Sequence, residues 1–164
     1  MKAMRQSSKS PFGLFLRAFK YAGRGVWHCV VRERNFRFHL CACAYAAYFL
    51  RFFSPTRAET AVVILLCGLV LALEGVNSAV ERAVDCATSE YSKFAELAKD
   101  IAAGSVLIGA ATAVAAGVAM FGRSELLLPV VEYHLVPHRL VLLLLSAAAA
   151  VLFVFAVPTK KSTN

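Results

Sequence analysis

The chain has 164 residues, of which 59% are hydrophobic, and it carries a formal net charge of +8. Soluble domains contain about 45–50% apolar residues, so this composition argues against a water-soluble protein and favours an integral membrane protein. The positive charge is concentrated in residues 1–37, which hold nine Lys and Arg against one acid, Glu33. Beside membrane spans, such a basic segment indicates contact with anionic lipid headgroups rather than with nucleic acid.

The N-terminal region divides into two parts. Residues 1–10 are polar, and we expect them to be mobile. Residues 11–35 mix apolar and basic positions at spacings of three, four and seven, which predicts an amphipathic helix lying on the membrane surface. Trp27 and Tyr21 in this segment are residue types typical of the membrane interface.

Apolar segments in the rest of the chain predict an all-α membrane bundle with four spans. These spans are expected at about residues 36–53, 58–87, 99–122 and 139–157. A helix needs about 18–20 predominantly apolar residues to cross a bilayer, and these segments are long enough. Residues 123–138 contain Pro129, Pro137, His134 and His138, and we expect them to form a loop before the last span.

The distribution of Lys and Arg predicts how the spans are oriented. With the N-terminus in the cytoplasm, the inner segments hold 14 of these residues and the outer segments hold four. Cytoplasmic loops of membrane proteins carry the excess of positive residues. We therefore expect the N-terminus, the C-terminus and the charged stretch 74–100 at the cytoplasmic face of the membrane, where ATP is available.

A row of polar side chains lies at the inner end of the second predicted span. Glu74, Asn77, Glu81 and Asp85 stand at positions i, i+3, i+7 and i+11, and Ser78 lies on the same side. At about 100° per residue, the first four fall within roughly 80° of one another on one helix face. Glu74 follows fourteen uncharged residues, and acids at such a depth usually have a function.

Further charged residues stand near this face. Lys99 and Asp100 precede the third predicted span, and Glu33 follows the surface helix. Together these residues offer carboxylates for Mg²⁺, a cation for phosphate and an acid that can accept a proton, which suits phosphoryl transfer. Spacing alone leaves three roles open: catalysis, transport of ions or protons, and solvated or paired acids with a structural role.

Other sequence motifs add little. The chain has no GxxxxGK[ST] loop and no protein-kinase motif set. Its five cysteines lie mostly in apolar runs, without the spacing of a zinc site. His134 and His138 are separated by Pro137 from a common helix face, so we interpret them as loop residues rather than metal ligands.

Three segments resemble the bacterial diacylglycerol kinase and undecaprenol kinase family. They are ERNFRFHL (33–40), ExxNxAxExxVD (74–85) and KDIAAGSV (99–106). The similarity covers roughly residues 12–122, in the order and spacing of the family. The resemblance implies a homotrimer whose protomers have a surface helix and three spans, with active sites between protomers near the cytoplasmic boundary. Residues 123–164 would then be an addition to a kinase domain at 11–122.

The resemblance also assigns roles to single residues. It implies that Glu74 is the base for the lipid hydroxyl and that Asn77 helps to order it. It implies that Glu33 and Glu81 hold Mg²⁺ together with the phosphates of ATP. The nucleotide site would further include Tyr21, Asp85, Glu90, Tyr91, Lys99 and Asp100. The lipid would contact Glu74, Arg17, Phe36 and Arg37.

The lipid substrate is a matter of resemblance alone. The sequence of residues 33–40 resembles that of the family branch that phosphorylates undecaprenol. We therefore favour undecaprenol over diacylglycerol as the substrate. Some family members have an Arg near the start of the surface helix where this chain has Leu14, with Arg17 nearby. The expected activity is therefore transfer of the γ-phosphoryl group of ATP to a membrane lipid alcohol, most closely matching an undecaprenol kinase.

Overall fold

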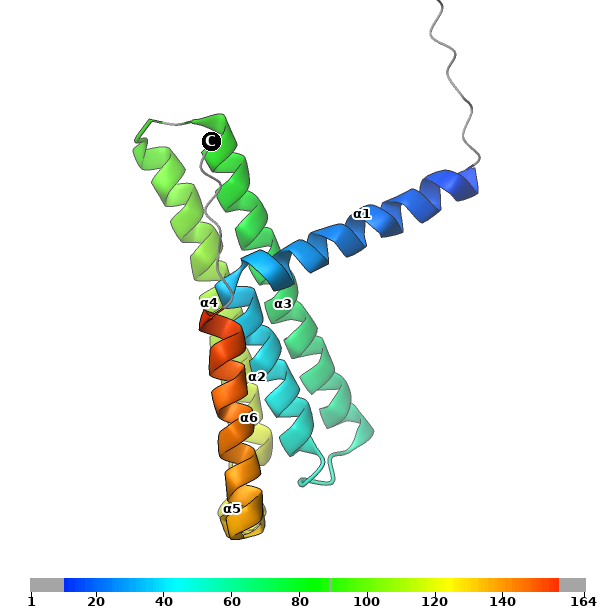
Figure 1. The fold of residues 1–164 in the computed structure, drawn as a ribbon, viewed down its shortest axis with the longest axis vertical. Helices are drawn as coiled ribbons and strands as arrows, with labels where there is room; N and C mark the ends of the chain where they lie inside the picture. Colours follow the sequence, from blue (N-terminus) through cyan, green and yellow to red (C-terminus); the bar gives the residue numbers. More distant parts are fainter. Residues whose placement is uncertain (1–10, 89, 157–164) are drawn as a thin grey trace, which may run out of the picture.

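The computed structural model describes residues 11–88 and 90–156, which form six helices and no strand. In chain order the helices are α1 (Pro11–Arg32), α2 (Arg34–Leu50), α3 (Arg57–Ala87), α4 (Lys93–Phe121), α5 (Ser124–Leu135) and α6 (Pro137–Phe155). The predicted all-α membrane fold is confirmed. Figure 1 shows α2, α3, α4 and α6 running along the long axis, while α1 projects sideways from them.

Helix α1 leaves the bundle partway along its long axis, so that part of α3 and α4 lies on either side of its level (Figure 1). It is amphipathic, as its sequence predicts, and it meets α2 at a sharp corner about halfway along α3 (Figure 1). The last part of α3 and the first part of α4 extend past the level of α1. An amphipathic helix lies in the plane of the membrane interface, so this extension reaches beyond the surface that α1 marks.

Helices α3 and α4 form the longest packed pair of the bundle. The side chain of Thr56 accepts a hydrogen bond from the backbone of Glu59, and Glu59 bonds back to Thr56, so a capping box starts α3. The two helices approach closely at Gly109, where an added Cβ would lie 2.7 Å from Cδ1 of Leu73. Buried Val70 and Val106 fill the same contact region.

Three of the described helices are long and apolar enough to cross a membrane: α3, α4 and α6. The fourth expected span, α2, has 17 residues and begins with Arg34 and Arg37 in its first turn. At 1.5 Å per residue it is about 26 Å long, slightly less than the roughly 30 Å of a hydrocarbon core. Large apolar side chains such as Leu65, Leu107 and Leu145 remain exposed, as expected for surfaces that face lipid.

The expectation of a loop at residues 123–138 was wrong, because Ser124–Leu135 form helix α5. Both prolines are compatible with helix. Pro137 stands at the first position of α6, where a missing N–H removes no helical hydrogen bond. Pro129 lies inside α5, and the helix continues past it through the buried residues Val130 and His134.

Candidate active site

The acidic face predicted on α3 is present and is partly buried. Glu74 is 3% exposed, Asn77 4% and Ser78 4%, so all three side chains point into the bundle. Asn77 Nδ2 donates a hydrogen bond to Glu81 Oε1 at 3.0 Å, one turn farther along the helix. Asn77 Oδ1 is buried and accepts no hydrogen bond from the described part of the chain. A ligand hydroxyl or a water can satisfy this oxygen.

A cavity of about 190 Å³ opens beside Glu74 and Asn77. Two polar side chains of α2, Asn35 and His39, line it from one side, and α4 contributes an apolar wall. The wall consists of Ala103, Val106, Leu107 and Ala110. Asn35 and His39 were not among the predicted site residues, although their i, i+4 spacing places them on one helix face. The cavity therefore combines hydrogen-bonding groups with a surface that suits hydrocarbon.

A second cavity of about 200 Å³ lies between the same three helices, nearer their other ends. Its lining is almost entirely apolar, and it includes Phe49 and Phe53 of α2, Leu66 of α3, and Gly117 and Phe121 of α4. No ionisable side chain other than the thiol of Cys67 lines it. The second cavity contains no acid, base or cation. The carboxyl, amide and imidazole groups therefore line only the cavity beside Glu74.

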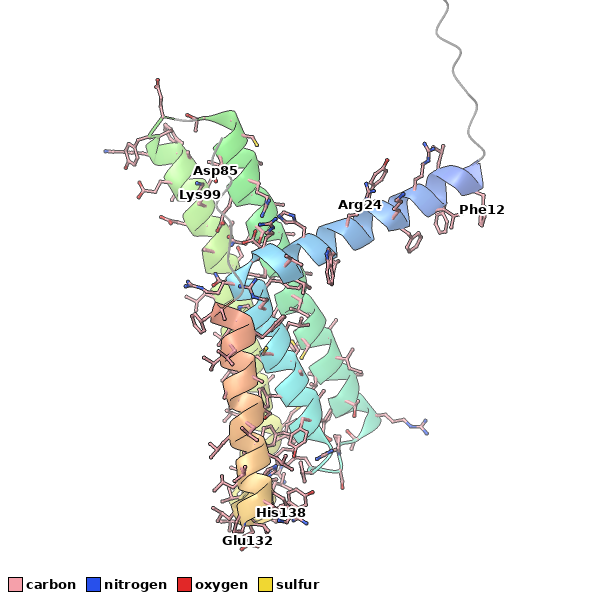
Figure 2. All side chains as sticks on the ribbon, in the orientation of Figure 1. Phe12, Arg24, Asp85, Lys99, Glu132 and His138 are labelled. Carbon is pink, nitrogen blue, oxygen red and sulfur yellow. The ribbon has the colours of Figure 1, made fainter. Side chains whose placement is uncertain are left out.

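Two ion pairs connect helices on the side of the site that faces water. Glu33, at the corner between α1 and α2, pairs with Arg82 of α3, and Lys99 of α4 pairs with Asp85 of α3. Figure 2 shows Asp85 and Lys99 together near the end of the α3–α4 hairpin. Arg82 and Asp85 are exposed, so each pair contributes only about 0–1 kcal/mol to stability. Such pairs can exchange their partners for a bound ligand at little cost.

The negative charges of Glu33 and Glu81 both act on the buried carboxyl group of Glu74. Glu33 stands at the N-terminal cap position of α2, but its side chain makes no capping hydrogen bond and turns to Arg82 instead. The backbone N–H of Glu33 donates to the carbonyl of Cys29 at 3.0 Å. Acids from the α1–α2 corner and from α3 thus lie in one region, which suits the binding of phosphate together with a cation.

Comparison with known proteins decides what kind of site this is. Residues 20–121 match a family model described as prokaryotic diacylglycerol kinase. The chain belongs to this family.

The similarity to single members of the diacylglycerol kinase family is substantial. The undecaprenol kinase of Bacillus subtilis (strain 168) is 35% identical over 107 residues, which cover 65% of this chain and 87% of that relative. The diacylglycerol kinase of Synechocystis sp. is 33% identical over 117 residues, or 71% of this chain and 67% of the relative. The diacylglycerol kinase of Helicobacter pylori (strain 26695) is 31% identical over 98 residues, or 58% and 77% respectively.

Family membership selects among the three roles that the acidic face left open. The chain is an ATP-dependent lipid kinase and a bacterial membrane protein. The matched region ends at Phe121, so helices α5 and α6 lie outside it. The buried acid at Glu74, the cavity and the two ion pairs all lie within the matched region.

Two residues to which the resemblance assigned roles in the kinase, Tyr21 for the nucleotide and Arg17 for the lipid, stand on α1 away from the acidic face. Tyr21 is 62% exposed on α1, where the guanidinium of Arg24 stacks over its ring at 6.0 Å. Figure 2 shows Arg24 and Phe12 on the part of α1 that leaves the bundle, and Arg17 is exposed between them. These side chains therefore stand on the interfacial helix rather than at the cavity.

The α3–α4 turn of the kinase holds another part of the predicted nucleotide site. Glu90 and Tyr91 of this turn are exposed, and so is Asp100 in the second turn of α4. Tyr91 Oη donates to Glu96 Oε2 at 2.7 Å, and this bond to a carboxylate raises the pKa of Tyr91. The turn thus carries polar side chains in water, next to the pair of Lys99 and Asp85.

Arg37, which the resemblance suggested as a lipid contact, has a different environment in this kinase. Its side chain is 0% exposed, and it donates to Val31 O at 3.0 Å, to Val30 O at 3.4 Å and to Val154 O at 2.8 Å. The side chain is committed to backbone carbonyls, which leaves no surface for a lipid. Phe36 is also buried, with 7% of its surface exposed. Sequence alone could not show this, because Val154 lies 117 residues farther along the chain.

The kinase offers carboxylates for a cation from two elements. Among the described residues, no three His, Cys, Asp or Glu side chains converge as a complete metal site. Mg²⁺ in ATP-using enzymes is usually held by one or two carboxylates together with phosphate oxygens and water. Glu33 and Glu81 fit this requirement, since both carboxylates lie near enough to act on the same buried Glu74 and a cation would offset their charge. His134 lies elsewhere, buried in α5 and bonded to Tyr48.

Proposed function

We propose that this kinase transfers the γ-phosphoryl group of Mg-ATP to the hydroxyl of undecaprenol, with Glu74 as the general base. The observation that carries the proposal is the buried carboxylate of Glu74 in a cavity whose opposite wall is apolar. A long-chain alcohol likewise combines one polar hydroxyl with an apolar hydrocarbon chain. Farther along α3, the ion pairs of Arg82 with Glu33 and of Asp85 with Lys99 would face a water-soluble nucleotide.

Glu74 would accept the proton of the lipid hydroxyl as its oxygen attacks the γ-phosphorus of ATP. A new O–P bond then forms, the bond between the γ-phosphorus and the β–γ bridging oxygen breaks, and ADP leaves. General base catalysis of this kind contributes about 10²–10⁴-fold to a rate. Asn77 Oδ1, which is buried and has no hydrogen-bond partner among the described residues, would orient the hydroxyl or a water beside it.

Glu33 and Glu81 would hold Mg²⁺ with the phosphates of ATP. The ion would offset charge on the phosphates in the transition state. Asn77 donates to Glu81, and this bond fixes the direction of one proposed ligand. Lys99 would leave Asp85 to contact phosphate, while Asp100 and Asp85 bind the nucleoside end. Tyr21, Glu90 and Tyr91 would join only when α1 and the α3–α4 turn close over the nucleotide.

The choice of undecaprenol over diacylglycerol rests on the relatives. The relative with 35% identity is named undecaprenol kinase, while relatives with 33% and 31% identity are named diacylglycerol kinases. Arg17 on the interfacial helix, and the cavity beside Glu74, would contact the lipid. The hydrocarbon chain would extend along the same three helices toward the second, apolar cavity.

We further propose that the kinase works as a homotrimer, with its active site and both termini at the cytoplasmic face. The last turn of α6 reaches Arg37 beside the Glu33 corner, so the C-terminal end of α6 is on the same side as the proposed ATP site. The exposed apolar surfaces of α3 and α4 are available both to lipid and to neighbouring protomers.

A side-by-side assay tests the function. The purified kinase in mixed detergent–lipid micelles receives Mg-ATP with undecaprenol in one arm and diacylglycerol in the other, and the phosphorylated lipid is measured. We expect faster turnover per micellar lipid with undecaprenol. Faster turnover with diacylglycerol would reverse the substrate assignment, and absence of product with both lipids would refute the proposed function.

A further inference from the structure

Helix α6, which lies outside the region shared with the family, is attached to α2 at several polar points. Tyr45 Oη and Ser146 Oγ are hydrogen-bonded at 3.0 Å near the middle of the two helices. At the end near Glu33, Arg37 donates to Val154 O at 2.8 Å, and the guanidinium of Arg34 stacks over the ring of Phe155 at 5.6 Å. Figure 1 shows α6 lying beside α2 along its length.

Arg37 joins the C-terminal ends of two helices. The last four carbonyls of a helix have no partner within that helix, and they carry the negative end of its dipole. Val30 and Val31 belong to the last turn of α1, and Val154 belongs to the last turn of α6. The buried guanidinium of Arg37 binds carbonyls from both ends. Since unsatisfied polar groups in an apolar environment are costly, each helix end depends on the same side chain.

The corner that Arg37 fixes carries Glu33. Arg37 stands one turn after Glu33, and its backbone N–H donates to Glu33 O at 3.2 Å. Its side chain reaches back to α1 on the other side of this corner. Arg37 therefore contacts α1, the backbone of Glu33 and α6 at the corner from which the Glu33 side chain extends to Arg82.

We propose that α6 is a positioning element for the Mg-ATP site and that Arg37 is the positioning residue through which it acts. Val154 O helps to hold the Arg37 guanidinium, which orders the corner of α1 and α2 and keeps Glu33 beside the acidic face of α3. This inference rests on the proposed role of Glu33 in binding Mg-ATP. It gives the C-terminal addition a catalytic purpose in the same protomer, beyond anchoring the chain in the membrane.

The test interrupts α6 in the full-length chain. Insertion of Gly-Pro after Ala149 breaks or kinks α6 before its last turn, because proline cannot continue the helical hydrogen bonds, and moves Val154 O away from Arg37. The matched control inserts Gly-Pro after Ala156, beyond the end of α6, and leaves the contact in place. We expect the first insertion to raise the KM for Mg-ATP roughly tenfold with little change in the KM for lipid, and the control to match the unmodified kinase.

A second measurement does not depend on kinase activity. Cys29 lies in the last turn of α1 and is half-buried, so its rate of alkylation reports the order of the corner. With the other four cysteines replaced, we expect the insertion after Ala149 to speed alkylation several-fold. If the unmodified chain had no kinase activity, the proposed function would be refuted. The alkylation rates would still show whether α6 orders the corner of α1 and α2.

Variants of Arg37 separate positioning from general damage to the fold. Arg37→Met should raise the KM for Mg-ATP as the insertion does, Arg37→Lys should recover part of the effect, and the insertion should add little to Arg37→Met. Helical content by circular dichroism checks that each variant is folded. Unchanged alkylation and an unchanged KM for Mg-ATP after the insertion would overturn the inference, and so would faster alkylation with an unchanged KM.

Discussion

Glu33 and Arg82 form an ion pair that ties the corner of α1 and α2 to α3, next to the proposed metal ligand Glu81. The pair brings together residues 49 positions apart in the sequence, and Glu33 keeps 23% of its side chain exposed. The proposed ligand is thus held near its site before any nucleotide arrives.

Replacing Arg82 tests this arrangement. Without its partner, Glu33 should sample more orientations, so Arg82→Gln should raise the KM for Mg-ATP by about three- to tenfold with a smaller effect on kcat. Because the pair is exposed, the loss of stability should be at most about 1 kcal/mol. Steady-state kinetics and thermal unfolding in detergent measure the two effects. A large drop in melting temperature without a change in KM would show that the pair is only structural.

Replacing Glu74 tests the general base. Glu74→Gln keeps the size of the side chain and removes its ability to accept a proton, so kcat should fall by about 10²–10⁴-fold. The matched control is Glu132→Gln, which changes an exposed acid of α5 at the far end of the molecule (Figure 2) and should keep full activity. Turnover of phosphorylated lipid is measured for both variants, and a fully active Glu74→Gln would exclude Glu74 as the base.

Removing divalent metal tests the role of Glu33 and Glu81. Chelation of Mg²⁺ should abolish lipid phosphorylation, and added Mg²⁺ should restore it. Glu81→Gln should then need a several-fold higher Mg²⁺ concentration for half-maximal rate, because one of two proposed carboxylates is lost. Titrations of Mg²⁺ at saturating ATP measure this shift. An unchanged Mg²⁺ requirement in both Glu81→Gln and Glu33→Gln would place the metal elsewhere.

Two glycines of α4 provide a matched test of the packing beside the site. Nothing lies within 4 Å of a Cβ built at Gly104, so Gly104→Ala should stabilise the helix by up to about 1 kcal/mol. At Gly109 the new Cβ would meet Cδ1 of Leu73, so Gly109→Ala should gain less or should destabilise the kinase. Thermal unfolding of both variants measures the difference, and equal gains would contradict the close contact of α3 and α4.

The thiol of Cys29 gives a prediction about pH. Burial, and next the negative charge of Glu33, raise the pKa of Cys29, so the unreactive thiol form persists to higher pH than in the unfolded chain. Alkylation requires the thiolate, so it should be slow at neutral pH and should accelerate as the pH rises. Glu33→Gln removes a charge that raises this pKa, so it should speed alkylation at a fixed mildly alkaline pH. An unchanged rate would mean that Glu33 does not lie near Cys29.

The sequence predicted the reactive end of the molecule better than the packing around it. The spacing of Glu74, Asn77 and Glu81 is a property of one helix, so it could be worked out from the helical repeat, and the structure has these residues on one partly buried face. The partner of Arg37 could not be found in this way, because Val154 belongs to a different helix near the other end of the chain.

Other differences have local causes. The prolines at 129 and 137 suggested a loop, but one stands at a helix start and the other is tolerated within α5. Asn35 and His39 stand at i and i+4, a spacing that could have placed both on the helix face toward the cavity. The basic and aromatic residues around them made this pattern hard to recognise. The roles assigned to Tyr21, Glu90, Tyr91 and Asp100 stay predictions, since they depend on a bound nucleotide.

The length of α3 has a consequence for how two unlike reactants meet. Its 31 residues make a rod of about 46 Å, which exceeds the roughly 30 Å of a hydrocarbon core. Glu74 and Asp85 are eleven residues apart on this rod, so about 16 Å separates them along its axis. A single unbroken helix therefore holds the proposed lipid site at Glu74 and the proposed nucleotide site at Asp85 at a fixed spacing. The nucleoside of ATP and the hydrocarbon of the lipid can each stay in their own solvent, while the triphosphate bridges the distance and its γ-phosphoryl group meets the lipid hydroxyl beside Glu74.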